Sequence, residues 1–322
     1  MKTLIKSLLG LCLGLSFTGC IEFEDQEIVY HHDQEKDEIR MTLRYEGIFG
    51  NLKKSGQFVS YQKTPEDKAT PEKLNLLQIE QLASVLNEKQ AFFFRNWMFE
   101  FKRVSLKAML RDETPRRKGI MFGKPEKDLI EALLKEVEIE NVGFYKDKDG
   151  RLCGAQTLRL SNASKVISLY NRVLGRCLKA NIPELRDEAR MFLMLLFSDG
   201  RKLPSFTPET FDLIETKLQE EFPFIQVEGN LITLTMPMTR PDQKRFSEST
   251  LKGLPQGTNI EFQDEALLVK IGGKDAREGK LSKKCYEGYL PNALNHVREN
   301  HKKLLLNPLE VNQKLHAFLG FD

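Results

Sequence analysis

Short runs in which apolar and polar residues alternate come in neighbouring pairs along the chain, and this pattern restricts the fold more than any other feature. Residues 39–45 alternate strictly between apolar and polar side chains. A period of two is typical of a strand with one buried and one exposed face. Residues 28–32 precede this run across the polar turn 33–37, so we expect the two runs to pair as an antiparallel hairpin.

Three later stretches of the chain have the same organisation. Apolar runs lie on both sides of the turn-rich segment 146–150, on both sides of Gly229-Asn230, and within residues 259–272. Glycine and asparagine tolerate the positive φ angles that tight hairpin turns require. We therefore expect a hairpin at each of these places.

An aromatic run, residues 91–101, contains a further predicted strand. Its apolar phase changes to Val104 and Leu106, which predicts a β-bulge at residues 102–103. Aromatic side chains at strand spacing usually build a core, so we interpret this run as core rather than as the lining of a ligand pocket.

Apolar residues at helical spacing predict a helix with one buried stripe in the segment that begins at Val166. The stripe consists of Val166, Leu169, Tyr170, Val173, Leu174, Cys177 and Leu178. Similar spacing and helix-start signals predict further helices at residues 74–86, 125–137, 183–197 and 207–221, and from residue 292 onward with a break near Pro308. Residues 191–197 are apolar all round, so they are either part of a central helix or a strand.

Hairpins that do not alternate regularly with helices indicate an α+β fold rather than a parallel doubly wound sheet. We expect antiparallel strand pairs packed with several amphipathic helices. We also expect a strand-rich N-terminal lobe at residues 20–160 and a helix-rich C-terminal lobe with two hairpins at residues 161–322.

The composition excludes some classes of function. Of the 322 residues 40% are hydrophobic, which is enough for a substantial core, and the formal net charge is only +3. Nucleic-acid-binding proteins usually carry a strongly basic footprint, so we expect no nucleic-acid partner. After the N-terminal segment, no run reaches the roughly 20 apolar residues that a membrane-spanning helix needs.

The N-terminus has the parts of a secretory signal. Lys2 and Lys6 precede the apolar run 8–17, which is too short to span a bilayer comfortably, and Thr18-Gly19-Cys20 follows it. There are two alternatives to a cut at Cys20. The segment could be an ordinary signal peptide that is cut at another residue, or a membrane helix that is retained.

This segment resembles the lipobox of bacterial lipoprotein precursors, although Phe17 stands where that family usually has leucine. The resemblance implies that residues 1–19 are a lipoprotein signal peptide and are removed. It also implies that Cys20 becomes the first residue, carries two or three acyl chains and attaches the protein to a membrane. Because Ile21 is not the aspartate associated with inner-membrane retention, the family's sorting rule favours the outer membrane.

Three further cysteines follow the predicted anchor: Cys153, Cys177 and Cys285. Cys153 has the strand phase opposite to that of Leu158 and Leu160. If the leucines face the helix that contains Cys177, then Cys153 points away from it. We therefore predict no disulfide between Cys153 and Cys177.

The spacing of the histidines and acidic residues does not fit a metal site or a catalytic group. His31 and His32 are adjacent on a predicted strand, so their side chains point to opposite faces and do not suit one ion. His296 and His301 are five residues apart, whereas a zinc-binding helix pair is four apart. Asp147 and Asp149 fit a turn.

Other short motifs have ordinary structural interpretations. The glycines and lysines at residues 272–274 and 279–280 lack P-loop spacing. Asn162-Ala163-Ser164 is interpreted as a helix start, and the basic segment 116–118 as a solvated loop. We therefore predict no catalytic, metal-binding or cofactor-binding residue, and Cys20 is the one predicted site, for lipid.

These observations favour a membrane-anchored lipoprotein whose body is a non-catalytic binding, assembly or structural module of the bacterial cell envelope, with an unidentified envelope protein or polymer as partner. The alternative is a membrane-tethered periplasmic hydrolase whose carboxylates or histidine meet only in the folded state. Convergence of such groups in a cleft, with perturbed pKa values, would favour the alternative.

Overall fold

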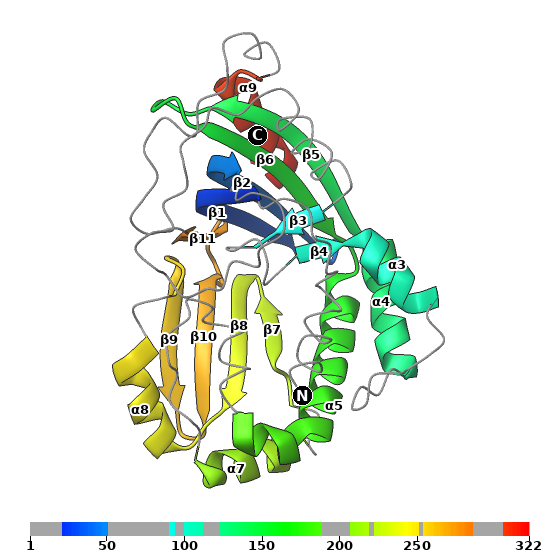
Figure 1. Ribbon diagram of the computed structural model, residues 1–322, viewed down its shortest axis with the longest axis vertical. Coiled ribbons are helices and arrows are strands. Elements are labelled where there is room, and N and C mark those ends of the chain that lie inside the picture. Colours follow the sequence, from blue (N-terminus) through cyan, green and yellow to red (C-terminus); the bar gives the residue numbers. More distant parts are fainter. Residues whose placement is uncertain are drawn as a thin grey trace.

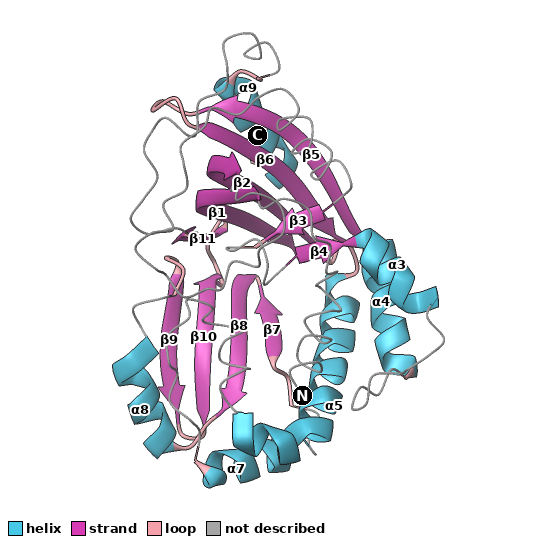
Figure 2. Cartoon of the chain, in the orientation of Figure 1, coloured by secondary structure: helices cyan, strands magenta, loops and turns pink. Residues whose placement is uncertain are grey.

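The computed structural model describes residues 21–50, 90–93, 100–111, 123–188, 207–218, 222–250, 254–285 and 305–321. These residues form helices and three antiparallel sheets (Figures 1 and 2). The prediction of an α+β fold with antiparallel strand pairs is confirmed.

The largest sheet has five strands in the order β11-β1-β2-β6-β5. Its strands are β1 (Ile21–Asp33), β2 (Glu38–Gly50), β5 (Val137–Lys146), β6 (Leu152–Leu160) and β11 (Gly279–Lys284). The predicted hairpins β1–β2 and β5–β6 are both present, and β2 pairs with β6 to join them. The sheet therefore combines strands from both halves of the chain.

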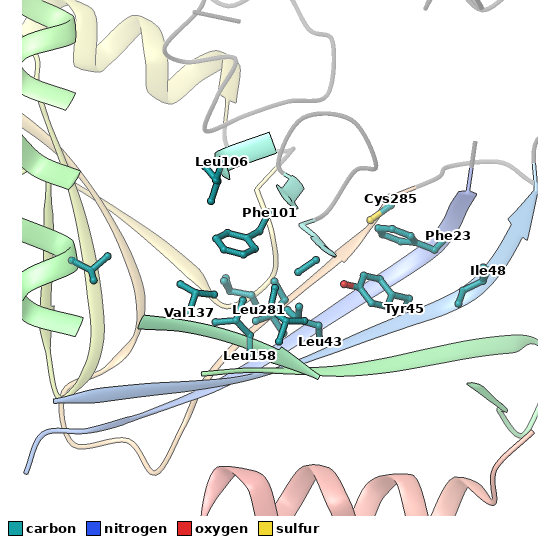
Figure 3. Packing of buried hydrophobic residues seen from close by; sticks show 14 of the residues in the cluster. Phe23, Leu43, Tyr45, Ile48, Phe101, Leu106, Val137, Leu158, Leu281 and Cys285 are labelled. Carbon is teal, nitrogen blue, oxygen red and sulfur yellow. The ribbon is translucent and has the colours of Figure 1, made fainter. Parts of the chain in front are cut away.

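One face of this sheet carries the main hydrophobic core. Figure 3 shows side chains from the strands meeting Phe101 and Leu106, which lie above the sheet. The covering elements are β3 (Gln90–Phe92), β4 (Glu100–Lys102), α3 (Arg103–Arg111), α4 (Lys124–Glu136) and the first part of α5 (Ala163–Glu188). Burial of this apolar surface is the main stabilising contribution on this side.

The opposite face of the sheet is covered by α9 (Pro308–Leu319). Val311 and Leu315 of α9 pack against Tyr145, Cys153 and Ala155. Asn307 caps the start of the helix with its side chain, and Gly320 ends it with a φ of 80°. The five-stranded sheet is thus the middle layer of a three-layer arrangement.

A second sheet of four strands has the order β7-β8-β10-β9. Its strands are β7 (Ile225–Glu228), β8 (Asn230–Pro237), β9 (Thr258–Gln263) and β10 (Ala266–Gly273), with α7 (Pro208–Leu218) and α8 (Arg240–Thr250) beside them (Figure 1). The predicted hairpins β7–β8 and β9–β10 are confirmed. Phe246 of α8 packs on Met236 and Val269 of this sheet.

The segment 274–278 between β10 and β11 connects the two sheets, because β10 belongs to the smaller sheet and β11 to the larger one. β11 and α9 come from the C-terminal half of the chain but lie on the sheet that the N-terminal half begins. The division into lobes at residues 160 and 161 stays a prediction.

Two local predictions were wrong. The expected bulge at residues 102–103 is the point where β4 ends and α3 begins, so the change of apolar phase marks a change from strand to helix. α5 also continues past Pro183 to Glu188, where we expected a second helix to start. The predicted helix at 74–86 and the start of the C-terminal helical segment lie outside the described residues.

Candidate functional site

The strand β1 begins at Ile21, the residue that directly follows the predicted lipid-attachment residue Cys20. Ile21 already pairs with Gly50 of β2. Cys20 itself lies outside the described residues. We call the end of the five-stranded sheet that contains the start of β1, the end of β2 and the β5–β6 turn the Cys20 end.

Both strands of the β1–β2 hairpin change phase near the Cys20 end. Phe23 and Ile48 are opposed and face the main core, as do Gln26 and Tyr45. Two residues lie between Phe23 and Gln26 on β1, and two lie between Tyr45 and Ile48 on β2. In a regular strand, an odd number of residues separates two side chains that point to the same face. The extra residue on each strand turns neighbouring acidic side chains to the other face.

Gly47 makes this irregularity compatible with the packing. Its φ is +64°, which favours glycine, and an added Cβ would lie 2.6 Å from Oε2 of Glu24. The carboxylate of Glu24 therefore occupies space that any other residue at position 47 would fill.

Four carboxylates converge on the guanidinium of Arg151 at the Cys20 end. Nε of Arg151 lies 2.7 Å from Asp147, and Nη1 lies 3.0 Å from Glu24 and 3.6 Å from Asp25. Nη2 lies 3.3 Å from Glu46. We call these five residues the Arg151 cluster; it fastens the β5–β6 turn to β1 and β2.

The pKa values in this cluster follow from burial and from the excess of acids. Burial raises the pKa of Glu46, and Arg151 opposes that shift, while nearby carboxylates, including Asp25 and Asp147, reinforce it. Burial alone would lower the pKa of Arg151, but its hydrogen bonds with Asp147 and Glu24 hold it above its ordinary value. Arg151 therefore stays charged at any pH at which the protein is folded.

This arrangement suits a structural junction better than catalysis. A pair of catalytic carboxylates must leave space for a substrate between them. Here the guanidinium fills that space and is only 22% exposed. No group of three or more acidic, histidine or cysteine side chains in the described part of the chain is arranged as a metal site.

Sequence reasoning missed the Arg151 cluster, because it interpreted Asp147 and Asp149 only as turn residues. That interpretation holds locally: Oδ1 of Asp147 accepts hydrogen bonds from the backbone N–H groups of Asp149 and Arg151. The available signal was the pair of adjacent acids Glu24-Asp25 facing Glu46-Gly47 across the predicted hairpin.

The other end of β1 carries the two adjacent histidines, and their rings have different partners. Nδ1 of His31 donates to the carbonyl oxygen of Arg277 (3.2 Å), and the ring meets Phe321 edge-on. Nδ1 of His32 donates to the carbonyl oxygen of Gly229 (3.0 Å). The two rings thus do not converge, as the strand geometry predicted.

Buried polar side chains on the core face of the five-stranded sheet hold the backbone of β3. Nε2 of Gln26 donates to the Phe92 carbonyl (2.7 Å), and Nε2 of Gln156 donates to the Gln90 carbonyl (2.8 Å). The hydroxyl of Tyr45 accepts from the Phe92 N–H (3.1 Å) and donates to Oε1 of Gln156 (2.7 Å). This polar row supplies hydrogen-bond partners to the backbone of β3, which lies across the face of the sheet rather than along its edge.

The remaining motifs have structural roles where they are described. Gly272-Gly273 ends β10 and Lys274 follows it, and α5 begins at Ala163 beside Asn162, as the sequence predicted. Ser164 donates its hydroxyl and its N–H to Asp37. His296, His301, the basic segment 116–118 and most of the aromatic run 91–101 lie outside the described residues.

Cys153 and Cys177 lie on opposite sides of the five-stranded sheet. Cys153 packs with Val311 and Leu315 of α9, whereas Cys177 packs against the main core. Both are thiols, so the prediction that no disulfide joins them is confirmed. Burial raises the pKa of each to about 12, which disfavours the reactive thiolate.

Comparisons with protein-family models, with curated proteins and with solved structures found no match to this chain. Among the residues that the structure describes, no helix has the length and apolar character needed to cross a membrane.

Proposed function

We propose that the protein is a lipoprotein of a bacterial cell envelope, attached to its membrane by acyl chains on Cys20, with a body that serves as a non-catalytic binding, assembly or structural module. The lipobox-like Phe17-Thr18-Gly19-Cys20 sequence is the basis for the lipid. The outer membrane is the proposed location, because Ile21 follows the cysteine.

One structural observation supports this proposal. The first described strand begins at Ile21, and it is paired from that residue onward. A chain cut before Cys20 would keep every described residue of β1 and all of its described pairing with β2.

The geometry of the acidic residues favours a binding or structural body over the hydrolase. The carboxylates that do converge, in the Arg151 cluster, are engaged by a guanidinium. The described histidines make no bond to a carboxylate: His31 and His32 bond to backbone carbonyls, and His316 lies on an exposed position of α9.

The intact mass of the N-terminal peptide from membrane-extracted protein tests the proposal. We expect a peptide that begins at Cys20 and is heavier by two or three acyl chains. A Cys20→Ala variant should be lost from the membrane fraction, whereas a Cys285→Ala variant should stay there. An unmodified N-terminus at another residue would refute the lipid anchor.

A further inference from the structure

The covalent connection between Cys20 and β1 leaves almost no tether between the proposed lipid and the folded body. Consecutive Cα atoms are about 3.8 Å apart, so Cys20 lies one residue from a backbone that is already paired with β2. A flexible linker of many residues would let a body tumble above the bilayer. Here the start of β1 must stay at the membrane surface.

The β5–β6 turn lies at the same end of the sheet as this start. Tyr45 pairs with Gly154, and Gly50 pairs with Ile21. From this paired position, Asp149 is five residues along the chain from Gly154, and Gly50 is five residues from Tyr45. The tip of the turn therefore reaches about as far along the sheet as Gly50 and its partner Ile21. Figure 1 shows the tip of the β5–β6 hairpin on the side toward which β2 ends.

The Arg151 cluster makes the turn and the start of β1 one unit. Arg151 binds Glu24, which is the third residue after Ile21, and Asp147 within the turn. Backbone hydrogen bonds between Asp147, Gly150 and Arg151 close the turn. A membrane surface that touches the start of β1 is therefore also close to the turn.

The opposite end of the strands is far from this surface. β1 has 13 residues, which at about 3.3 Å per residue corresponds to about 40 Å. The turn between β1 and β2 lies there, with Glu35 exposed at its tip. The turn Gly229 and the residues Asn230 and Gly272 of the four-stranded sheet also meet β1 at this end.

No apolar side of the described body favours lying flat on the lipid. The large apolar side chains that are exposed in the described residues are Val104 on α3, Phe262 on β9 and Leu309 on α9. They belong to three separate elements and make no common patch, and membrane-surface binding scales with contiguous buried apolar area.

We infer that the protein stands on its membrane with the Cys20 end of the five-stranded sheet against the lipid headgroups, the turn 147–150 at the surface, and the β1–β2 turn pointing away. This inference rests on the proposed lipid at Cys20. It leaves the four-stranded sheet, which joins β1 at the far end, available to a partner in the envelope.

Two matched labels test the orientation. Asp149→Cys and Glu35→Cys each place one exposed thiol at a hairpin tip. The native thiols Cys153 and Cys177 react slowly because burial raises their pKa to about 12, and the Cys285 thiol is buried. The lipidated protein, labelled with a dye, is reconstituted into phosphatidylethanolamine–phosphatidylglycerol vesicles with a quencher on the headgroup. Most of the emission should be lost for the label at residue 149 and little for the label at residue 35.

Other results would overturn the inference in distinguishable ways. Equal quenching of both labels on vesicle-bound protein would mean that the anchor exists but the body has no such orientation. Protein that does not stay on the vesicles would instead refute the proposed anchor, and the orientation with it.

A spacer separates anchoring from surface adhesion. A Gly/Ser insert of about 12 residues between Cys20 and Ile21 has a root-mean-square span of about 20 Å. It should relieve most of the quenching at residue 149 while the protein remains on the vesicles. Unchanged quenching would show that adhesion, rather than the short connection to Cys20, holds the turn at the membrane.

Discussion

The hydroxyl of Tyr30 lies 2.8 Å from the carbonyl oxygen of Asn230 and donates to it across the junction of the two sheets. The same hydroxyl is 2.9 Å from the carbonyl oxygen of Ile271. Tyr30 belongs to the five-stranded sheet and is only 1% exposed, whereas both acceptors belong to the four-stranded sheet. The phenol therefore joins the sheets through backbone groups that have little access to water.

Replacing Tyr30 by phenylalanine should destabilise the protein by about 1–3 kcal/mol. The substitution keeps the ring but leaves buried carbonyl oxygens without the donor, and an unsatisfied buried acceptor costs about that much. Urea unfolding of wild-type and Tyr30→Phe protein measures the difference. A change below about 0.5 kcal/mol would mean that water or another donor replaces the hydroxyl.

Gly279→Ala should destabilise the protein more severely than Tyr30→Phe. An added Cβ at Gly279 would lie 2.0 Å from Cζ of Tyr30, and the packed ring has no free direction in which to move. Overpacking of this kind costs about 1–3 kcal/mol or more. Gly273→Ala is the matched control at the end of β10, because its Cβ would meet only Ala276, at 3.5 Å. Equal unfolding midpoints for the two variants would contradict the packing argument.

The free energy of unfolding should fall in alkaline solution, because a buried thiol and a buried phenol lose their protons there more readily in the unfolded chain than in the folded one. Burial raises the pKa of Cys153 from 9 and that of Tyr30 from 10, each to about 12. A folded-state pKa above the unfolded value means that the folded form binds the proton more tightly. This contribution is complete below about pH 9 and is lost as the pH rises toward 12.

Thermal unfolding between pH 8 and pH 11 measures this effect. The melting temperature should stay level up to about pH 9 and fall from there to pH 11, and Cys153→Ala should lessen the fall that starts near pH 9. A flat profile would show that Cys153 and Tyr30 ionise equally well in the folded and unfolded states.

Arg151→Gln should cost about 2–3 kcal/mol at pH 7, a value below that for a fully buried ion pair because Arg151 is 22% exposed. The substitution leaves the carboxylates of Glu24, Glu46 and Asp147 close together without their cation. Burial and the neighbouring carboxylates already raise the pKa of Glu46, and Arg151 opposes that shift, so loss of the cation should raise the pKa of Glu46 further. Protonation therefore favours the folded variant, and most of the lost stability should return as the pH falls from 7 to about 4.

Urea unfolding of Arg151→Gln at these two pH values tests the sign. Arg240→Gln is the control, because Arg240 pairs with Asp264 at a position where both side chains are largely exposed, and such pairs contribute about 0–1 kcal/mol. A deficit in Arg151→Gln that is independent of pH would indicate lost packing rather than lost charge compensation.

The features that sequence reasoning predicted are those that depend on neighbouring residues. The hairpins β1–β2, β7–β8 and β9–β10 each join runs separated by a short turn, so alternation and turn residues suffice to identify them. The opposite orientation of Cys153 and Cys177 also followed from strand phase alone.

The features that escaped prediction depend on contacts between distant segments. Arg151 meets Glu46 and Glu24 from 105 and 127 residues away, and β11 reaches β1 from the other half of the chain. A change of apolar phase has the same local signature in a bulge as in a strand that becomes a helix, which explains the error at residues 102–103.

The polar row beneath β3 leads to the last prediction. Gln156 is fully buried, donates to the Gln90 carbonyl and accepts from the Tyr45 hydroxyl. Gln156→Leu keeps a similar volume but removes both interactions, so the backbone of β3 loses one donor directly and the Tyr45 hydroxyl loses its acceptor. Because β3 has three residues and pairs only with β4 among the described strands, side chains supply much of what holds it on the sheet.

Hydrogen exchange in Gln156→Leu should therefore speed up by about tenfold or more at residues 90–92, a factor that corresponds to about 1.4 kcal/mol. The β1–β2 hairpin should keep its protection. Equal acceleration across both regions would mean that Gln156 supports the whole sheet rather than the attachment of β3.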